Sequence, residues 1–100
     1  PSTTQLADGM ACSTPEPAAL DMLQTGLHAV VQVSDGEIAA AMRRLFEATH
    51  QVAEGAGAAA LAAAWQQRAQ LAGQRTALVL SGGNVDRDVF ARVLSESDLP

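Results

Sequence analysis

The sequence predicts an α/β domain in which helices flank a mainly parallel sheet. Four stretches carry apolar residues every three or four positions, as helices do, and three short apolar runs between them are typical of strands. Because helices separate the strands, we expect parallel pairing through right-handed crossovers. Ligands of such sheets bind beyond the carboxyl ends of the strands. With 100 residues, the chain holds at most one domain with a modest core.

The first helix is expected after residues 14–17 (Thr-Pro-Glu-Pro), which offer an N-cap and then a proline for the first helical position. Leu20, Leu23 and Leu27 give this helix its apolar spacing. Gly26, near its end, suits a residue in the left-handed conformation.

The second helix is expected to begin at Ser34 and Glu37, which have the spacing of a capping box. Its apolar face comprises Ile38, Met42, Leu45, Phe46 and Thr49. Charged residues are expected to lie largely outside that face: Glu37, Arg43, Arg44 and Glu47.

The third helix is Ala-dominated and is expected to pack closely, from the Gly-Ala-Gly turn at residues 55–57 to a stop at Gly73. Leu61, Trp65 and Leu71 are its larger apolar residues. A last helix is marked by Val89, Phe90, Val93 and Leu94. The strands are expected at residues 28–33, 50–54 and 76–80.

Composition excludes several functional classes. The net charge is −5, with six arginines against eleven acidic residues, so neither nucleic acid nor an anionic membrane is an expected partner. No apolar run is long enough to span a membrane. Lysine is absent, which removes from this chain every mechanism that needs a lysine amine, Schiff-base chemistry included.

The cysteine and histidine residues give no sign of a metal site. Cys12 is the only cysteine, so an internal disulfide and an all-cysteine zinc site are excluded, and a cytoplasmic location fits best. His28 and His50 have no carboxylate or cysteine at metal-ligand spacing. We therefore expect surface or interface roles for both histidines.

The strand at residues 76–80 leads into Ser-Gly-Gly-Asn at residues 81–84, which places a hydroxyl and two glycines at its carboxyl end. Two glycines allow a ligand to approach the backbone closely, and Asn84 or Asp86 can cap the next helix. The same residues also make an ordinary strand-to-helix turn without a ligand. Spacing alone leaves both interpretations open.

A second turn, at residues 55–60, matches the G-x-G-x-x-A form of a dinucleotide site. We reject a dinucleotide site because it needs an acidic residue at the end of the next strand, where Ser81 stands. What remains is a glycine-flanked turn preceded by Glu54, on the same side of the sheet as Ser81. Glu54 either faces the same ligand or is an ordinary carboxylate favoured at a helix start.

Four segments taken together resemble the carboxyl-terminal part of threonine dehydratases, which are fold-type-II pyridoxal-phosphate enzymes similar to serine racemase and tryptophan synthase β. The segments are Thr-Gln-Leu-Ala-Asp-Gly at 4–9, Val-Ser-Asp-Gly-Glu-Ile at 33–38, Glu-Gly-Ala-Gly-Ala-Ala at 54–59 and Leu-Ser-Gly-Gly-Asn-Val-Asp at 80–86. Their order and spacing also look like that family, over nearly the whole chain. The resemblance implies that residues 1–100 are the carboxyl-terminal segment of a catalytic domain, part of a tryptophan-synthase-β-like large domain.

The resemblance also implies roles for individual residues. In that family the serine of the Ser-Gly-Gly-Asn turn hydrogen-bonds the pyridine nitrogen of the cofactor, which corresponds to Ser81, and the matching glutamate, Glu54, borders the ring. The implied cofactor-binding residues are Ser81, Gly82, Gly83, Asn84, Glu54 and Gly9. Asp8 lies near the cleft, and the chain carries no catalytic residue and no metal ligand. A hydroxyl need not protonate the ring nitrogen, so the ring is a milder electron sink than one paired with aspartate, which favours β-elimination.

The parts that such an enzyme also needs belong to segments upstream of this chain: the Schiff-base lysine, an asparagine, the glycine-rich phosphate loop and metal ligands. The resemblance therefore implies a dehydratase or deaminase that converts threonine or serine to a 2-oxo acid and ammonia, with this chain inert alone. Its expected partners are the missing amino-terminal portion, the amino acid substrate and further copies in a homo-oligomer. Racemase or hydroxyaspartate dehydratase activity is compatible with the same residues.

A non-catalytic alternative stays open from the sequence. A truncated relative would act as a binding or oligomerisation module and would hide its sheet edges and apolar helix faces, most simply in a homodimer.

Overall fold

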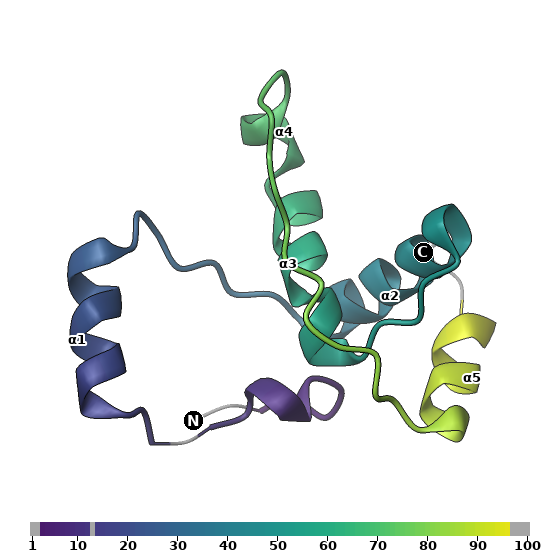
Figure 1. The fold of residues 1–100 in the computed structure, drawn as a ribbon. Helices are drawn as coiled ribbons and strands as arrows, with labels where there is room; N and C mark the ends of the chain where they lie inside the picture. Colours follow the sequence, from purple (N-terminus) through teal and green to yellow (C-terminus); the bar gives the residue numbers. More distant parts are fainter. Residues whose placement is uncertain (1–2, 13, 97–100) are drawn as a thin grey trace.

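The computed structural model describes residues 3–12 and 14–96. Its elements are the 3-10 helix η1 (Asp8–Met10) and the α-helices α1 (Pro17–Gly26), α2 (Asp35–Thr49), α3 (Gly55–Gln66), α4 (Arg68–Leu71) and α5 (Arg87–Ser95). Figure 1 shows α2, α3 and α5 gathered together, whereas α1 stands apart and is joined to α2 by an extended segment. Among the described residues, α1 contacts no other helix. None of the described helices is long and apolar enough to cross a membrane.

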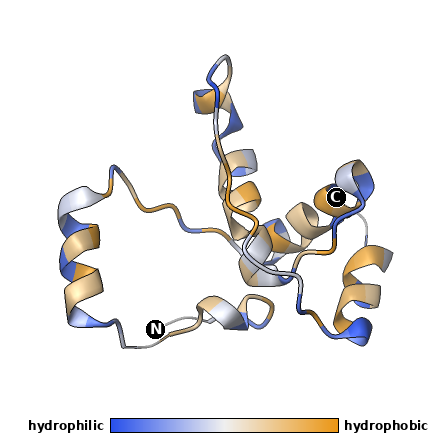
Figure 2. Ribbon diagram, in the orientation of Figure 1, coloured by the Kyte–Doolittle hydropathy of each residue, from blue (hydrophilic) through white to orange (hydrophobic). Residues whose placement is uncertain are grey.

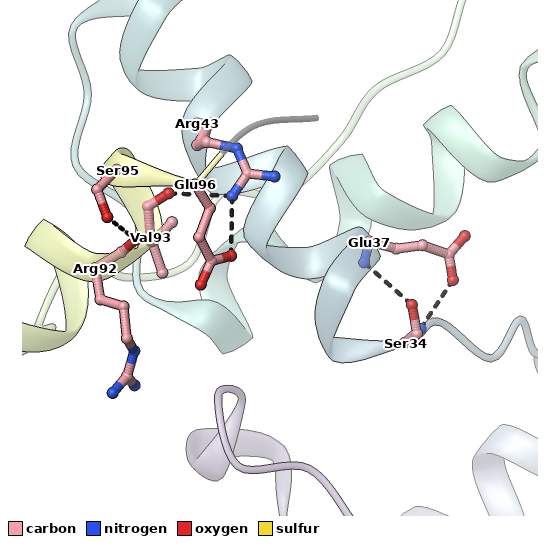
Figure 3. Close-up of polar contacts among 7 residues, drawn as sticks. All are labelled: Ser34, Glu37, Arg43, Arg92, Val93, Ser95 and Glu96. Carbon is pink, nitrogen blue, oxygen red and sulfur yellow. Dashed lines mark hydrogen bonds and ion pairs between the residues drawn. The ribbon is translucent and has the colours of Figure 1, made fainter. Parts of the chain in front are cut away.

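The predicted capping box starts α2. The Ser34 hydroxyl accepts a hydrogen bond of 3.1 Å from the Glu37 N–H, and the Ser34 N–H donates to the Glu37 carboxylate at 2.8 Å (Figure 3). These bonds satisfy backbone donors that have no partner inside the helix. The helix ends at His50, whose φ of 60° is left-handed and forms the C-cap.

The core lies where α2 packs against α3 and α5. Its buried apolar residues are Ala7, Ile38, Ala39, Ala41, Met42, Ala53, Ala58, Ala62 and Val93. Most of them are alanines, so the backbones of α2 and α3 approach closely, as expected for the Ala-rich helix. Met42 is the one large side chain that is fully buried among the described residues.

The ends of α1 differ from the sequence prediction. Glu16, and not Thr14, is the N-cap, because its carboxylate accepts a hydrogen bond of 2.9 Å from the Ala19 N–H. Pro17 takes the first helical position, where its missing N–H costs nothing. Gly26 does not adopt a positive φ; among the described glycines, only Gly73 does.

The Ala-rich helix stops earlier than predicted. α3 ends at Gln66, and α4 continues the path for one short turn before the chain reverses at Gly73 with a φ of +80°. The Arg68 guanidinium donates a hydrogen bond of 2.8 Å to the carbonyl of Trp65 and stacks over the Trp65 ring. The Trp65 carbonyl, near the end of α3, thus accepts from Arg68 as well as from the N–H of the C-cap residue Gln67.

The expected sheet is not confirmed, because the described residues contain no β-strand. Residues 28–33 and 76–80 are extended but unpaired, and Figure 2 shows both as apolar. Val30 and Val79 are 80% and 75% exposed. A strand exists only when a neighbour completes its ladder of hydrogen bonds, and neither segment has that neighbour here. Residues 50–54 are not a strand either, because His50 turns the chain at the end of α2.

The charged residues of α2 were expected to lie outside its buried face, and this is wrong for Arg43, which is only 6% exposed. Its Nη1 donates a hydrogen bond of 3.1 Å to the carbonyl of Val93 and lies 3.5 Å from a carboxylate oxygen of Glu96 (Figure 3). The predicted last helix is confirmed as α5, and Arg43 binds its carboxyl end. Asp86 occupies the N-cap position of α5 without a side-chain cap hydrogen bond.

Candidate functional site

The Ser-Gly-Gly-Asn turn meets the start of α3. The Glu54 N–H donates a hydrogen bond of 3.0 Å to the carbonyl of Gly82. Ser81 and Asn84, on either side of the two glycines, are exposed, whereas Glu54 is half-buried. The structure therefore brings Glu54 and the turn together, although they are 28 residues apart in the sequence.

Glycines make this contact possible. A Cβ atom at Gly57 would lie 2.4 Å from the carbonyl oxygen of Gly82, and one at Gly83 would lie 2.5 Å from that of Val52. A Cβ at Gly82 would lie 2.6 Å from a carboxylate oxygen of Glu54. At Gly57 and Gly83 the distance is to backbone and is too short for a side chain, so the backbones meet directly there, whereas at Gly82 the neighbour is the flexible Glu54 side chain.

The Leu6–Gly9 loop, which includes the start of η1, contacts α3 from another direction. A Cβ at Gly55 would lie only 2.3 Å from the carbonyl oxygen of Leu6, and one at Gly9 would lie 3.1 Å from the Cβ of Ala56. Asp8, in η1, is exposed. The first turn of α3 is thus contacted by Gly9 and Gly82 and preceded by Glu54, while Gly83 lies against Val52 just before it.

Two side chains that the sequence reasoning did not select hold the Leu6–Gly9 loop. The Thr4 hydroxyl donates to one carboxylate oxygen of Asp35, and the Gln5 N–H donates to the other at 2.8 Å. The Thr4 hydroxyl oxygen in turn accepts from the N–H groups of Ala7, at 2.9 Å, and Leu6, at 3.2 Å. The hydrogen bonds from Thr4 and then from Gln5 hold the pKa of Asp35 below its ordinary value.

Glu37 stabilises the other side of the α2 start. Hydrogen bonds from the Ser34 N–H and then from the Gln66 side chain lower the pKa of Glu37. The Gln66 amide also donates a hydrogen bond of 2.8 Å to the carbonyl of Gln32. Gln66 therefore joins the end of α3 to the start of α2, on the side away from the Leu6–Gly9 loop.

Two hollows lie beside this framework, and neither is lined by Ser81 or Glu54. One, of about 470 Å³, lies between α2 and α3 and is lined in part by Arg44 and Trp65, whose guanidinium and ring stack at 4.2 Å. The other, of about 580 Å³, lies between Met10 and the extended segment at 31–33. The Ser81 side chain is exposed and lines neither of these two hollows.

The described histidine and cysteine side chains do not assemble a ligand set. Cys12, His28 and His50 are exposed. Within residues 3–12 and 14–96, no three acidic, histidine or cysteine side chains gather where they could hold a metal ion.

Residues 1–82 match the family described as pyridoxal-phosphate dependent enzyme. This match covers well over half of the chain, so the chain belongs to that family. Membership implies pyridoxal phosphate as the cofactor of the complete enzyme. The matched residues include Glu54, Ser81 and Gly82 and end just before Gly83.

Several curated relatives within this family are similar to the chain. The chain is 35% identical over 91 residues to the L-threonine ammonia-lyase of Thermotoga maritima, and 41% identical over 86 residues to that of Geobacter sulfurreducens. It is 36% identical over 94 residues to the phenylserine dehydratase of Ralstonia pickettii. These alignments cover 91%, 86% and 93% of the chain but 22%, 21% and 29% of the relatives, so the chain spans less than a third of their length. No solved structure gives a significant match.

At the Ser81 turn, the serine hydroxyl is the group whose chemistry suits a pyridine ring. The Ser81 side chain is exposed, and its hydroxyl has no hydrogen-bond partner among the described residues. The two glycines that follow serve contacts within the chain, because the Glu54 carboxylate lies where a Cβ of Gly82 would be and the Val52 carbonyl oxygen lies where a Cβ of Gly83 would be. A hydroxyl that is free to donate is what a pyridine nitrogen, a hydrogen-bond acceptor, requires from one wall of its site.

Proposed function

We propose that the chain forms one wall of the pyridoxal-phosphate site in an ammonia-lyase that acts on hydroxy amino acids such as threonine or serine. The observation that carries the proposal is the contact between the Ser81–Asn84 turn and the start of α3, within a chain that belongs to this cofactor family. Relatives named for threonine and phenylserine support the hydroxy amino acid substrate.

Ser81 is proposed to donate its hydroxyl hydrogen to the ring nitrogen of the cofactor. Pyridoxal phosphate, when bound, supplies an electron sink for removal of the substrate's α-proton. A serine, unlike an aspartate, leaves the ring nitrogen without a full positive charge, and this limits the sink to proton loss and β-elimination. Glu54 is proposed to border the ring, because its backbone is fixed to Gly82.

The remaining walls are proposed to come from the amino-terminal portion of the enzyme. The chain has no lysine, so a lysine amine for the cofactor aldehyde has to be supplied from outside these 100 residues. The exposed apolar segments at 28–33 and 76–80 are proposed to pair as strands of a mainly parallel sheet with that portion. Pairing would satisfy their backbone groups and cover the exposed valines.

The proposed function is tested by assembling the chain with the amino-terminal portion and adding pyridoxal phosphate and threonine or serine. The expected result is an absorption band of bound cofactor together with formation of 2-oxo acid and ammonia. A folded assembly that binds the cofactor but releases only the opposite enantiomer of the substrate would identify a racemase. A folded assembly that binds no cofactor would favour the non-catalytic binding module.

Ser81→Ala tests the role of the hydroxyl. We expect a large loss of activity and a shifted cofactor absorption band, with a change of only about 1 kcal/mol in the free energy of unfolding of the cofactor-bound protein, because one neutral hydrogen bond, the proposed one to the cofactor, is lost. Ser95→Ala is the matched control, since the Ser95 hydroxyl bonds only the Arg92 carbonyl on α5. Parallel losses of stability and activity in Ser81→Ala would mean that Ser81 is merely structural.

A further inference from the structure

We propose that Asp35 is a positioning residue that acts through Thr4 to hold the Leu6–Gly9 loop at the edge of the cofactor site. The proposal rests on the proposed function, because that function makes the first turn of α3 part of the site. Asp35 is the first residue of α2 and does not itself contact Glu54 or Gly82.

Both oxygens of the Asp35 carboxylate bind the two residues that precede the Leu6–Gly9 loop. One accepts from the Thr4 hydroxyl and the other from the Gln5 N–H at 2.8 Å. Hydrogen bonds to an ionised acceptor are stronger than those between neutral groups. Because its single hydrogen is committed to Asp35, the Thr4 hydroxyl presents its oxygen lone pairs to the chain that follows.

The Thr4 hydroxyl oxygen, held in place by Asp35, binds the backbone at the start of the Leu6–Gly9 loop. It accepts from the N–H groups of Leu6 and Ala7, at 3.2 and 2.9 Å, which fixes a tight turn at residues 4–7. Ala7 is 2% exposed, so the turn is anchored in the core as well. The orientation of the Leu6 carbonyl therefore depends on Asp35 through one intervening hydroxyl.

The Leu6–Gly9 loop packs tightly against the first turn of α3. The Leu6 carbonyl oxygen lies 2.3 Å from where a Cβ of Gly55 would be, and Gly9 lies against Ala56. Gly55 adjoins Glu54, whose N–H binds the Gly82 carbonyl. A loosened loop would thus remove the support behind the Glu54 backbone, and a cofactor ring beside Glu54 would be held less firmly.

Glu37 supplies a matched control two residues away. It too is a carboxylate in the first turn of α2 with a lowered pKa, but its partners are Ser34 and Gln66. Removing its charge disturbs the same helix start without touching the loop. A difference between the two positions therefore reports on the loop and not on helix capping.

The test uses the full-length protein that contains this chain. Asp35→Ala is expected to speed amide hydrogen exchange at Leu6 and Ala7 about tenfold and to raise the dissociation constant for pyridoxal phosphate about tenfold. Asp35→Asn keeps one acceptor oxygen and should lie between parent and Asp35→Ala, which covers the case in which the alanine variant folds poorly. Glu37→Gln is expected to change both quantities by less than about twofold.

Thr4 is tested in the same protein. Thr4→Val, which keeps the shape but not the hydroxyl, should reproduce the effect of Asp35→Ala, and Thr4→Ser should restore parent behaviour. The double variant Asp35→Ala/Thr4→Val should lose no more than either single variant, because both act through one contact.

Two results would overturn the proposal: equal changes in Asp35→Ala and Glu37→Gln, or faster exchange at Leu6 and Ala7 with cofactor affinity unchanged. A parent protein that binds no pyridoxal phosphate defeats the proposed function instead. In that case the exchange rates still decide whether Asp35 holds the loop.

Discussion

Gly57 and Gly82 meet backbone to backbone, and this contact sets how closely the Ser81 turn can approach α3. A Cβ at Gly57 would lie 2.4 Å from the Gly82 carbonyl oxygen and 3.0 Å from its nitrogen. Both atoms belong to the backbone, so neither can rotate away. The same Gly82 carbonyl accepts the Glu54 hydrogen bond, and a shift would therefore break that bond too.

Gly57→Ala is expected to lower the free energy of unfolding of the full-length protein by about 1–3 kcal/mol, as overpacking does, and to weaken cofactor binding. Gly26→Ala is the matched control, because a Cβ at Gly26 meets nothing within 4 Å and a helical alanine is favoured over glycine. Chemical denaturation and cofactor titration measure both effects. If the two variants were equally stable, the close contact would not exist in solution.

At single residues, sequence reasoning succeeded where the signal was local. Ser34 and Glu37 are three positions apart and form the predicted capping box. Asp35 lies between them, yet its partner Thr4 is 31 residues away, and no spacing rule connects the two. The burial of Arg43 was missed for the same reason, because its partner carbonyl belongs to Val93.

Among the elements, α5 depends on Arg43 for its attachment to α2. The guanidinium donates to the Val93 carbonyl and pairs with Glu96, where the helix ends and backbone acceptors lack helical partners. Phe90 of α5 also packs edge-on against Phe46, with the ring centroids 5.7 Å apart. Polar and aromatic contacts together fix α5.

Arg43→Ala is expected to destabilise the full-length protein by about 1–3 kcal/mol, because the Val93 carbonyl loses its shorter hydrogen bond and keeps the one of 3.3 Å from the Glu96 N–H. Hydrogen exchange in α5 should rise more than in α3. Arg87→Ala is the control, since Arg87 and its partner Asp88 are both almost fully exposed and such pairs contribute little. Equal effects of the two substitutions would show that Arg43 does not anchor α5.

The helices could be predicted because the apolar spacing and the capping residues that indicate a helix lie within the same short segment of sequence. The strands could not be predicted from such local signals alone. Residues 76–80 have the β-branched and apolar composition of a strand, but a sheet needs hydrogen-bond partners that the described residues do not provide. The predicted strand is therefore not confirmed, because strand pairing depends on a neighbour and not on the composition of one segment.

The molecule as a whole has a small core and a large apolar exterior. Its radius of gyration is 14.3 Å, somewhat above the value of about 13 Å expected for a compact domain of this length. Met22 on α1, Val30 and Val79 are each more than 70% exposed. Such surfaces are normally covered in a stable assembly.

The isolated chain is therefore expected to associate with itself. Sedimentation velocity should give species heavier than the 10.3 kDa monomer, and Val30→Asp with Val79→Asp should shift the distribution toward the monomer. Addition of the amino-terminal portion should also replace the self-associated species. A parent chain that sediments as a stable monomer would contradict the inference that these segments await a partner.

The most direct measurement concerns the proposed hydrogen bond between Ser81 and the cofactor. In the full-length protein loaded with pyridoxal phosphate that is ¹⁵N-labelled in its ring, the nitrogen resonance of the parent should be that of an unprotonated pyridine. Ser81→Asp should move it to the position of a protonated ring, because a carboxylate favours the charged form. A resonance identical in parent, Ser81→Ala and Ser81→Asp would mean that Ser81 does not face the cofactor ring.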